Sequence, residues 1–250
     1  MSNSGGGVGL PIGGLSISSG PGIAAGGGGG LAGTNSGGPI EHPVRSAIRR
    51  VRDGGWVQLC DGSPFWPLNP RIEDVRIEPI AYALSRISRF CGHTSGEPYS
   101  VAQHSVIVSE MVEAEVRLNA CCTLDHGPCT NCTRVAALTG LLHDASEFVL
   151  SDILNPVKQV DSFVAYRVAE ATLQQVIYSA FNLLGSHCQG AEVLDVVDRR
   201  VLSTELRDLM PAGAETGEDA VLPYERTIEP WPWREAERKF LDRFHSLQPR

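Results

Sequence analysis

Apolar residues recur at helical spacing through most of the chain beyond residue 75, with polar residues between them. A period of three to four residues is typical of amphipathic α-helices that bury one face. The expected helices are a run from Ile80 to Ile87 with its end at Gly92, a run from Ser100 as N-cap to Met111, a run from Ala137 to Phe148, residues 160–184, residues 191–210 and a last run from Arg234 to Phe244. No series of alternating residues predicts strands after residue 75. The pattern therefore predicts an all-α fold, a bundle of about six helices.

Composition divides the chain into four parts. Residues 1–40 hold 16 of the 27 glycines and no charged side chain, so they are expected to be a disordered leader. Residues 41–75 carry a basic stretch and then an aromatic, Pro-rich segment, which predicts either a short β-hairpin around Asp61-Gly62 or an irregular lid. Residues 76–210 form the main helical domain, and residues 211–250 a loop and the last helix.

Composition also excludes several classes of protein. The leader lacks the basic start and continuous apolar core of a secretory signal, and no later segment has the roughly 18 apolar residues of a membrane span. The net charge of −8 argues against a surface for duplex nucleic acid, which needs clustered cations. Seven cysteines without a secretory signal indicate a reducing compartment. We therefore expect a cytoplasmic protein without membrane contact.

One pair of residues inside the third helical run predicts a metal site. His143-Asp144 lies between apolar neighbours, and a buried imidazole and carboxylate need partners. Both can be ligands of one divalent transition metal ion, such as Co, Mn or Zn. Further ligands are expected from other helices, namely His104 and an aspartate that is either Asp198 or Asp195.

Two further carboxylates suit the site to hydrolysis. Glu147 follows His143 at i+4, so a continuous helix would place both on one face. Asp152 comes after the helix break and can return towards the site. Carboxylates beside a metal-activated water take or relay its proton. Arg89 and Lys158 are candidate partners for a phosphate.

These residues resemble the H…HD…D signature of the HD-domain metal-dependent phosphohydrolases, and most closely the branch of 5′-deoxynucleotidases and related phage enzymes. The resemblance covers about residues 75–210. It is carried by three stretches, which are Leu84–Phe90 leading to Tyr99–Ser105, then Leu141–Glu147 with Asp152 and Pro156–Lys158, and finally Val197–Asp198 leading to Glu205–Met210.

The resemblance implies a role for each matching residue. The metal ligands are His104, His143, Asp144 and Asp198, and Asp198 is preferred to Asp195 because only it has Glu205 at the family's spacing. Glu147 and Asp152 are the catalytic carboxylates. For substrate binding, the resemblance implies Arg89 as the phosphate contact, and Phe90 stands where the family usually has Trp. His93 and Lys158 are further candidates for substrate binding from their positions in the sequence. His93 and Lys158 have alternative interpretations as a helix-capping and a solvated residue.

The implied substrate is a nucleotide, most closely a 5′-deoxyribonucleotide cleaved to a deoxynucleoside and phosphate. The alternative is a deoxynucleoside triphosphohydrolase, such as one acting on dATP, and a further alternative is a regulatory module without catalysis. Family resemblance also suggests a homo-oligomer. Trp56, Phe65 and Trp66 either stack on the base or pack as a lid.

A cysteine-rich insert at residues 121–132 departs from the family pattern. Cys129 and Cys132, with Cys121 or Cys122 and His126, have the residue types of a structural zinc site. A loop of free thiols is the alternative.

Overall fold

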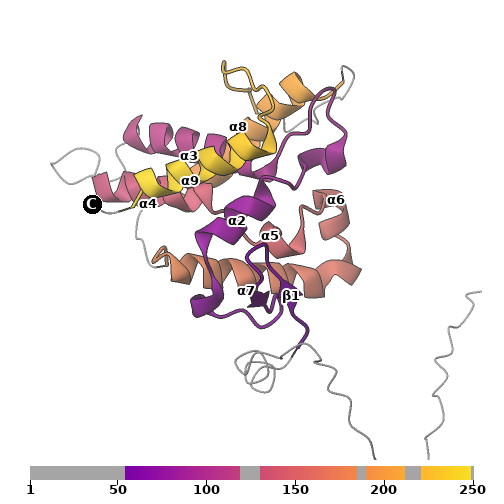
Figure 1. Ribbon diagram of the computed structural model, residues 1–250. Coiled ribbons are helices and arrows are strands. Elements are labelled where there is room, and N and C mark those ends of the chain that lie inside the picture. The colour runs from indigo at the N-terminus through magenta and orange to yellow at the C-terminus, as the bar shows by residue number, and fades with distance from the viewer. Residues whose placement is uncertain (1–53, 119–129, 185–189, 212–220, 249–250) are drawn as a thin grey trace, which may run out of the picture. The chain divides into compact units, whose positions relative to one another are not determined.

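The computed structural model describes residues 54–118, 130–184, 190–211 and 221–248. Most of these residues are helical, so the all-α expectation is confirmed (Figure 1). The α-helices of the described ranges are α2 (Ile77–Leu84), α3 (Val101–Leu118), α4 (Thr130–Leu141), α5 (Glu147–Leu150), α6 (Asn155–Lys158), α7 (Val164–Ala180), α8 (Gly190–Leu209) and α9 (Trp233–Ser246). Short 3₁₀ turns are η1 (Ile72–Asp74), η2 (Arg89–Gly92) and η3 (Asp161–Phe163). The helices beyond the expected six are α5 and α6, each a single turn.

A two-stranded antiparallel hairpin precedes the helices. Strands β1 (Val57–Gln58) and β2 (Pro64–Phe65) pair, and the turn includes Gly62 at φ +82°. Phe65 is fully buried and meets Phe148 edge-on, with ring centroids 5.0 Å apart. Trp66 is also buried, whereas Trp56 is half exposed. The hairpin therefore packs on the core with two of its three aromatic side chains.

Helix α2 is shorter than the sequence predicts, because it ends at Leu84 and not at Gly92. Ser88 is extended instead and forms an antiparallel β-bridge with Ser100, directly before α3. The Arg89 N–H donates to Tyr99 O at 2.9 Å, and the Val101 N–H donates to Ile87 O at 3.0 Å. These bonds replace the intrahelical ones that a longer helix would make.

The third predicted helix is divided. Helix α4 ends at Leu141, residues 142–146 form a turn, and α5 begins at Glu147. His143 and Glu147 therefore do not share one helix face, and the i+4 argument for their proximity is wrong. Contacts from other parts of the chain hold this turn, and they are described below.

Helix α3 is the central element, since every residue from Val101 to Ser109 is buried. Ser100 is its N-cap, as predicted, because its Oγ accepts the Gln103 N–H at 3.2 Å. Helices α4, α8 and α9 pack against α3. One apolar cluster includes Leu84 of α2 and Leu173 of α7, and a second joins α3 to α8. None of the described helices is long and apolar enough to cross a membrane.

Candidate metal centre

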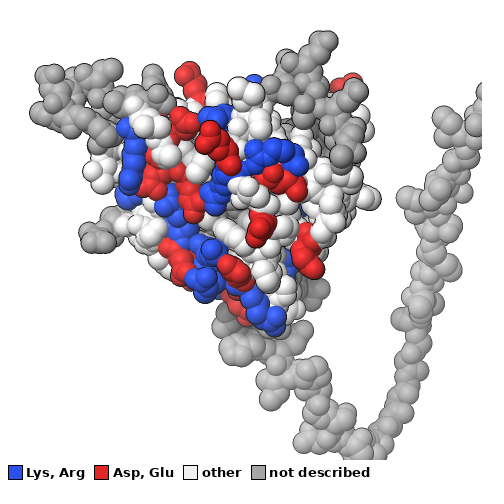
Figure 2. Space-filling model, turned by 90° about the horizontal axis from the view of Figure 1, so that it is seen from above, with Lys and Arg blue, Asp and Glu red and all other residues white. Residues whose placement is uncertain are grey.

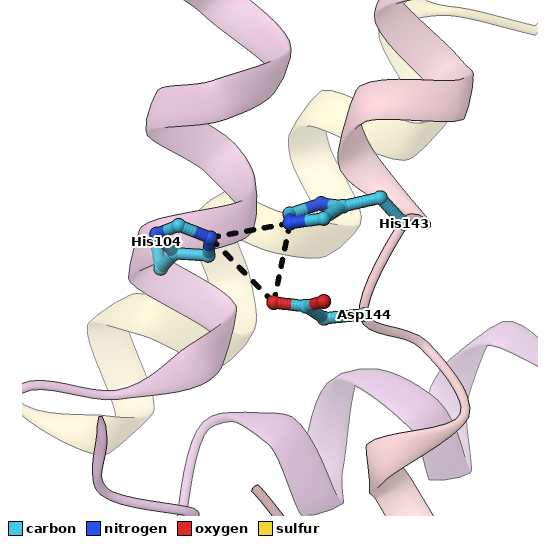
Figure 3. A group of neighbouring side chains, drawn as sticks. All are labelled: His104, His143 and Asp144. Carbon is cyan, nitrogen blue, oxygen red and sulfur yellow. Dashed lines mark hydrogen bonds and ion pairs between the residues drawn. The ribbon is translucent and has the colours of Figure 1, made fainter. Parts of the chain in front are cut away.

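Four of the residues expected as ligands converge from three parts of the fold. His104 lies in the first turn of α3, His143 and Asp144 in the turn after α4, and Asp198 in the middle of α8. Nε2 of His104 lies 3.2 Å from Nε2 of His143, 3.5 Å from Oδ2 of Asp144 and 3.1 Å from Oδ1 of Asp198. Nε2 of His143 lies 3.2 Å from Asp144 Oδ2 and 3.7 Å from Asp198 Oδ1. Figure 3 shows the His104, His143 and Asp144 side chains pointing towards one another.

The geometry of this cluster suits a metal ion. His104, His143 and Asp144 each offer one ligand atom within 4.8 Å of the others, so this group could hold a cation. Ligand atoms bound at about 2.0–2.2 Å to a tetrahedral ion lie about 3.3–3.6 Å apart, which is close to the separations here. Oδ1 of Asp198 is a buried atom, and Nε2 of His104 and Nε2 of His143 lie 3.1 and 3.7 Å from it.

The other aspartate that the sequence left open is placed differently. The Asp195 side chain is 71% exposed and pairs with Arg199 at 2.7 Å on the outer face of α8. Asp195 therefore lies away from the cluster.

Each imidazole is oriented by a hydrogen bond at its other nitrogen. Nδ1 of His143 lies 2.8 Å from the carbonyl oxygen of Gly140, to which it donates. Nδ1 of His104 lies 2.7 Å from Oε1 of the fully buried Glu205. Such partners turn Nε2 towards a shared point and set its lone pair there, as in histidine ligands of metals.

Glu205 entered the sequence argument only as a spacing marker, but the structure gives it a contact with the cluster. It follows Asp198 by seven residues, which is two helical turns, so both side chains project from one side of α8. The seven-residue spacing from Asp198 is therefore the feature of the sequence that could have placed Glu205 beside the cluster.

Arg89 brings a buried cation to the edge of the cluster. Its guanidinium lies 3.2 Å from Glu205 Oε2 and 3.5 Å from Asp144 Oδ2, and its side chain is 14% exposed. Burial opposes the charge, but Glu205 and Asp144 outweigh it and raise the pKa of Arg89. The backbone directly after Arg89 is left-handed, with φ +53° at Phe90 and +51° at Cys91.

The ligand-type side chains have shifted pKa values because they lie so close together. Burial opposes the charge on His143, but Asp144 and Asp198 outweigh it and raise its pKa to about 9. Burial likewise opposes ionisation of Asp198, but His104 and His143 lower its pKa to about 2. The pKa of Asp144 is lowered, again against burial, by His143 and His104. The cluster therefore attracts positive charge.

Glu147 and Asp152 lie near the cluster, although not on the predicted helix face. Burial, reinforced by Asp144 and Asp152, raises the pKa of Glu147 to about 9. Its Oε2 is buried without a hydrogen-bond partner among the described residues. Burial also raises the pKa of Asp152. Arg89 lowers this pKa and Asp144 raises it, and the net change is upward.

Lys158 lies next to this second group of carboxylates. Its Nζ is 3.7 Å from Glu147 Oε1 and 2.7 Å from Glu170 Oε1, and the side chain is 15% exposed. Glu170, on α7, had no feature in the sequence that distinguished it from a solvated helix residue.

The remaining predicted residues are not all brought to the cluster. His93 is exposed at the end of η2, and its backbone N–H donates to Phe90 O. Phe90 packs against the α3–α8 cluster, with its ring 5.7 Å from the Arg89 guanidinium. Of the proposed zinc site, Cys129 lies outside the described residues and Cys132 is in the first turn of α4.

The described residues thus define a helical protein with a His–His–Asp group that could hold a metal ion. An uncharacterized protein of Rhodobacter capsulatus is 36% identical over 104 residues, which are 41% of this chain and 46% of that relative. The uncharacterized protein YfdR of Escherichia coli is 30% identical over 154 residues, or 62% of this chain and 72% of YfdR. No profile of a known protein family matches the chain.

The chain belongs to the same family as YfdR. It spans less than half the length of the Rhodobacter capsulatus relative.

Proposed function

We propose that this protein is a metal-dependent phosphohydrolase of the HD type, and that it acts on 5′-deoxyribonucleotides. The observation that carries the proposal is the convergence of His104, His143, Asp144 and Asp198 beside a buried arginine and a buried carboxyl group. The sequence resemblance to deoxynucleotidases supports the nucleotide part.

These four side chains would be the ligands of one divalent transition metal. The His/Asp donor set suits such an ion, and the outward hydrogen bonds of both Nδ1 atoms leave Nε2 available. When bound, the ion would supply Lewis-acid activation of a water molecule and neutralise charge on the phosphate.

The neighbouring charged side chains would bind the phosphate and move the proton. Arg89 would contact a phosphoryl oxygen, because its guanidinium already lies at the edge of the cluster, 3.5 Å from Asp144. Glu147, with its raised pKa, would hold the proton that the departing ester oxygen takes. Asp152 would share this role, and Lys158 would keep Glu147 in place. Water adds to the α-phosphorus, the ester P–O bond breaks, and the products are a deoxynucleoside and phosphate.

The proposal predicts that hydrolysis depends on the proposed ligand Asp144 and not on the exposed Asp195, which lies away from the cluster. Metal-free protein is supplied with Mn²⁺, Co²⁺ or Zn²⁺ and incubated with the common dNMPs and dNTPs, and products are separated by chromatography. Asp144→Ala should lower the rate at least about a hundredfold, since even partners of ligands cost 10–100-fold. Asp195→Ala is the matched control and should retain the rate.

The same screen separates the alternatives. Phosphate from monophosphates supports the nucleotidase proposal, and triphosphate from dNTPs would replace it with a triphosphohydrolase using the same site. Wild-type protein that binds the metal but releases neither product would point to a regulatory module. Full activity in Asp144→Ala would contradict the proposed site.

A further inference from the structure

The turn that carries His143 and Asp144 interrupts a helix without a helix-breaking residue. Residues 141–147 contain neither glycine nor proline, and the sequence predicts a continuous helix through them. The structure instead has bonds of the i+3 type, from the Ala145 N–H to Leu142 O and from the Glu147 N–H to Asp144 O, both 3.1 Å long. The cause of the interruption must therefore lie outside the segment.

The side-chain amide of Gln174, which lies on α7, bonds to two backbone groups at the interruption. Its Nε2 donates to Leu142 O at 2.6 Å, and its Oε1 accepts the Ser146 N–H at 3.0 Å. Leu142 O and the Ser146 N–H are the i and i+4 partners that a continuous α-helix would bond directly to each other. The amide of Gln174 is inserted between them, and insertion of a side chain into this ladder is a known cause of helix breaks.

The interruption matters because His143 and Asp144 are adjacent in sequence. Successive side chains of a regular helix point in directions about 100° apart, so neighbours at i and i+1 do not converge. Here Nε2 of His143 and Oδ2 of Asp144 lie 3.2 Å apart, and both lie within 3.5 Å of His104 Nε2. Opening the helix between Leu142 and Ser146 allows both side chains to reach one point.

We propose that Gln174 is a positioning residue of the metal centre, which acts by holding this turn open so that His143 and Asp144 can bind the same ion. Gln174 itself is well placed, because the fully buried Leu173 and Ile177 anchor the same part of α7 in the core. The inference rests on the metal-site part of the proposed function, but not on the identity of the substrate.

The test compares Gln174→Met with Gln175→Met in the full-length, metal-free protein. Methionine keeps the length of the side chain but makes neither hydrogen bond, and Gln175 is the exposed neighbour on the same helix. Co²⁺ is titrated and its visible absorption recorded. Gln174→Met should bind Co²⁺ at least about tenfold more weakly and with an altered spectrum, whereas Gln175→Met should match the wild type. A residue that only stabilised the fold would leave affinity and spectrum of the folded protein unchanged.

A second measurement separates failure of this inference from failure of the proposed function. Amide hydrogen exchange across residues 142–147 should be faster in Gln174→Met than in the wild type, with other segments little changed. Wild-type protein that binds no Co²⁺ would overturn the proposed function and, with it, the metal-positioning role.

A different result would overturn the role of Gln174 but not the proposed function. In that case the wild type binds Co²⁺, and Gln174→Met has the same Co²⁺ affinity and the same rate of amide hydrogen exchange as the wild type. Gln174→Leu makes neither hydrogen bond and adds no charge, so it provides a second variant if the methionine form does not fold. It should weaken Co²⁺ binding in the same direction.

Discussion

The carboxylates of the centre differ in what surrounds them. Asp144, Asp198 and Glu205 face imidazoles or the Arg89 guanidinium, and each has a lowered pKa because these cations outweigh burial. Glu147 has Lys158 at 3.7 Å, but the carboxylates of Asp144 and Asp152 act on it as well, and its Oε2 has no hydrogen-bond partner among the described residues. Burial therefore dominates there and raises the pKa of Glu147 to about 9.

This difference predicts how Glu147→Gln changes stability in metal-free protein. The folded-state pKa of about 9 exceeds the ordinary value of 4.5, so the folded protein binds the extra proton between these values. The free energy of unfolding of the wild type must therefore fall as pH rises through that window. Glutamine cannot ionise, so Glu147→Gln should be more stable than the wild type by about 2 kcal/mol at pH 8, with little difference at pH 4.5.

Urea unfolding of EDTA-treated protein at several pH values measures this difference. The exposed Glu97→Gln substitution is the control. A difference between Glu147→Gln and the wild type that stays constant with pH would contradict the assignment of a raised pKa to Glu147.

At the scale of elements, α3 organises the fold because neighbours surround its first half. Gln103, next to His104, ties α3 to the segment that precedes α9. Its Nε2 donates to Glu229 O at 2.7 Å, and its Oε1 accepts the Trp231 N–H at 2.7 Å. One buried side chain thus satisfies two backbone groups from a segment without regular structure.

We expect Gln103→Leu to lower the free energy of unfolding by about 2 kcal/mol, because both backbone groups lose their partner in a partly buried place. The measurement is chemical denaturation of the full chain. Gln175→Leu, at an exposed position, should change stability by less than about 0.5 kcal/mol. Equal effects of the two substitutions would show that the Gln103 bonds contribute nothing specific.

At the scale of the whole molecule, acidic and basic side chains are mixed on the surface that Figure 2 shows, whereas the residues of the proposed centre come from one part of the chain. The face in Figure 2 carries interleaved acidic and basic side chains and shows no large patch of one sign. Ion pairs within the described residues include Arg226–Glu110 and Arg243–Glu113. The side chains of the proposed centre all lie between Arg89 and Glu205. Residues 1–40 contain no charged side chain and no histidine or cysteine.

Deletion of residues 1–40 should therefore leave hydrolytic rate, Co²⁺ affinity and thermal midpoint essentially unchanged. Activity assays and calorimetry of the truncated and full-length chains, at equal concentration, check this expectation. A large loss in either would assign the leader a part in assembly or in the site.

The sequence by itself determined the helical class, the position of most long helices and the N-cap at Ser100, because these depend on local periodicity and on bonds between near neighbours. It also singled out His104, His143 and Asp144, since polar groups in apolar helical runs need partners wherever the helices pack. The choice of Asp198 over Asp195 came from the family resemblance. The hairpin remained one of two alternatives, since its turn residues also suit a loop.

Only the tertiary structure decided where α2 ends and where the helix through His143 opens. Nothing between Leu141 and Glu147 disfavours a helix, so the pattern predicted a continuous one and placed Glu147 by the wrong geometry. The groups that replace the helical bonds come from elsewhere in the chain. The carbonyl oxygen of Tyr99 accepts the backbone N–H of Arg89. The side-chain amide of Gln174, 28 residues beyond Ser146, accepts the backbone N–H of Ser146. Local propensity cannot include a hydrogen bond whose partner arrives only when α7 packs, and that bond brings His143 and Asp144 to a common point.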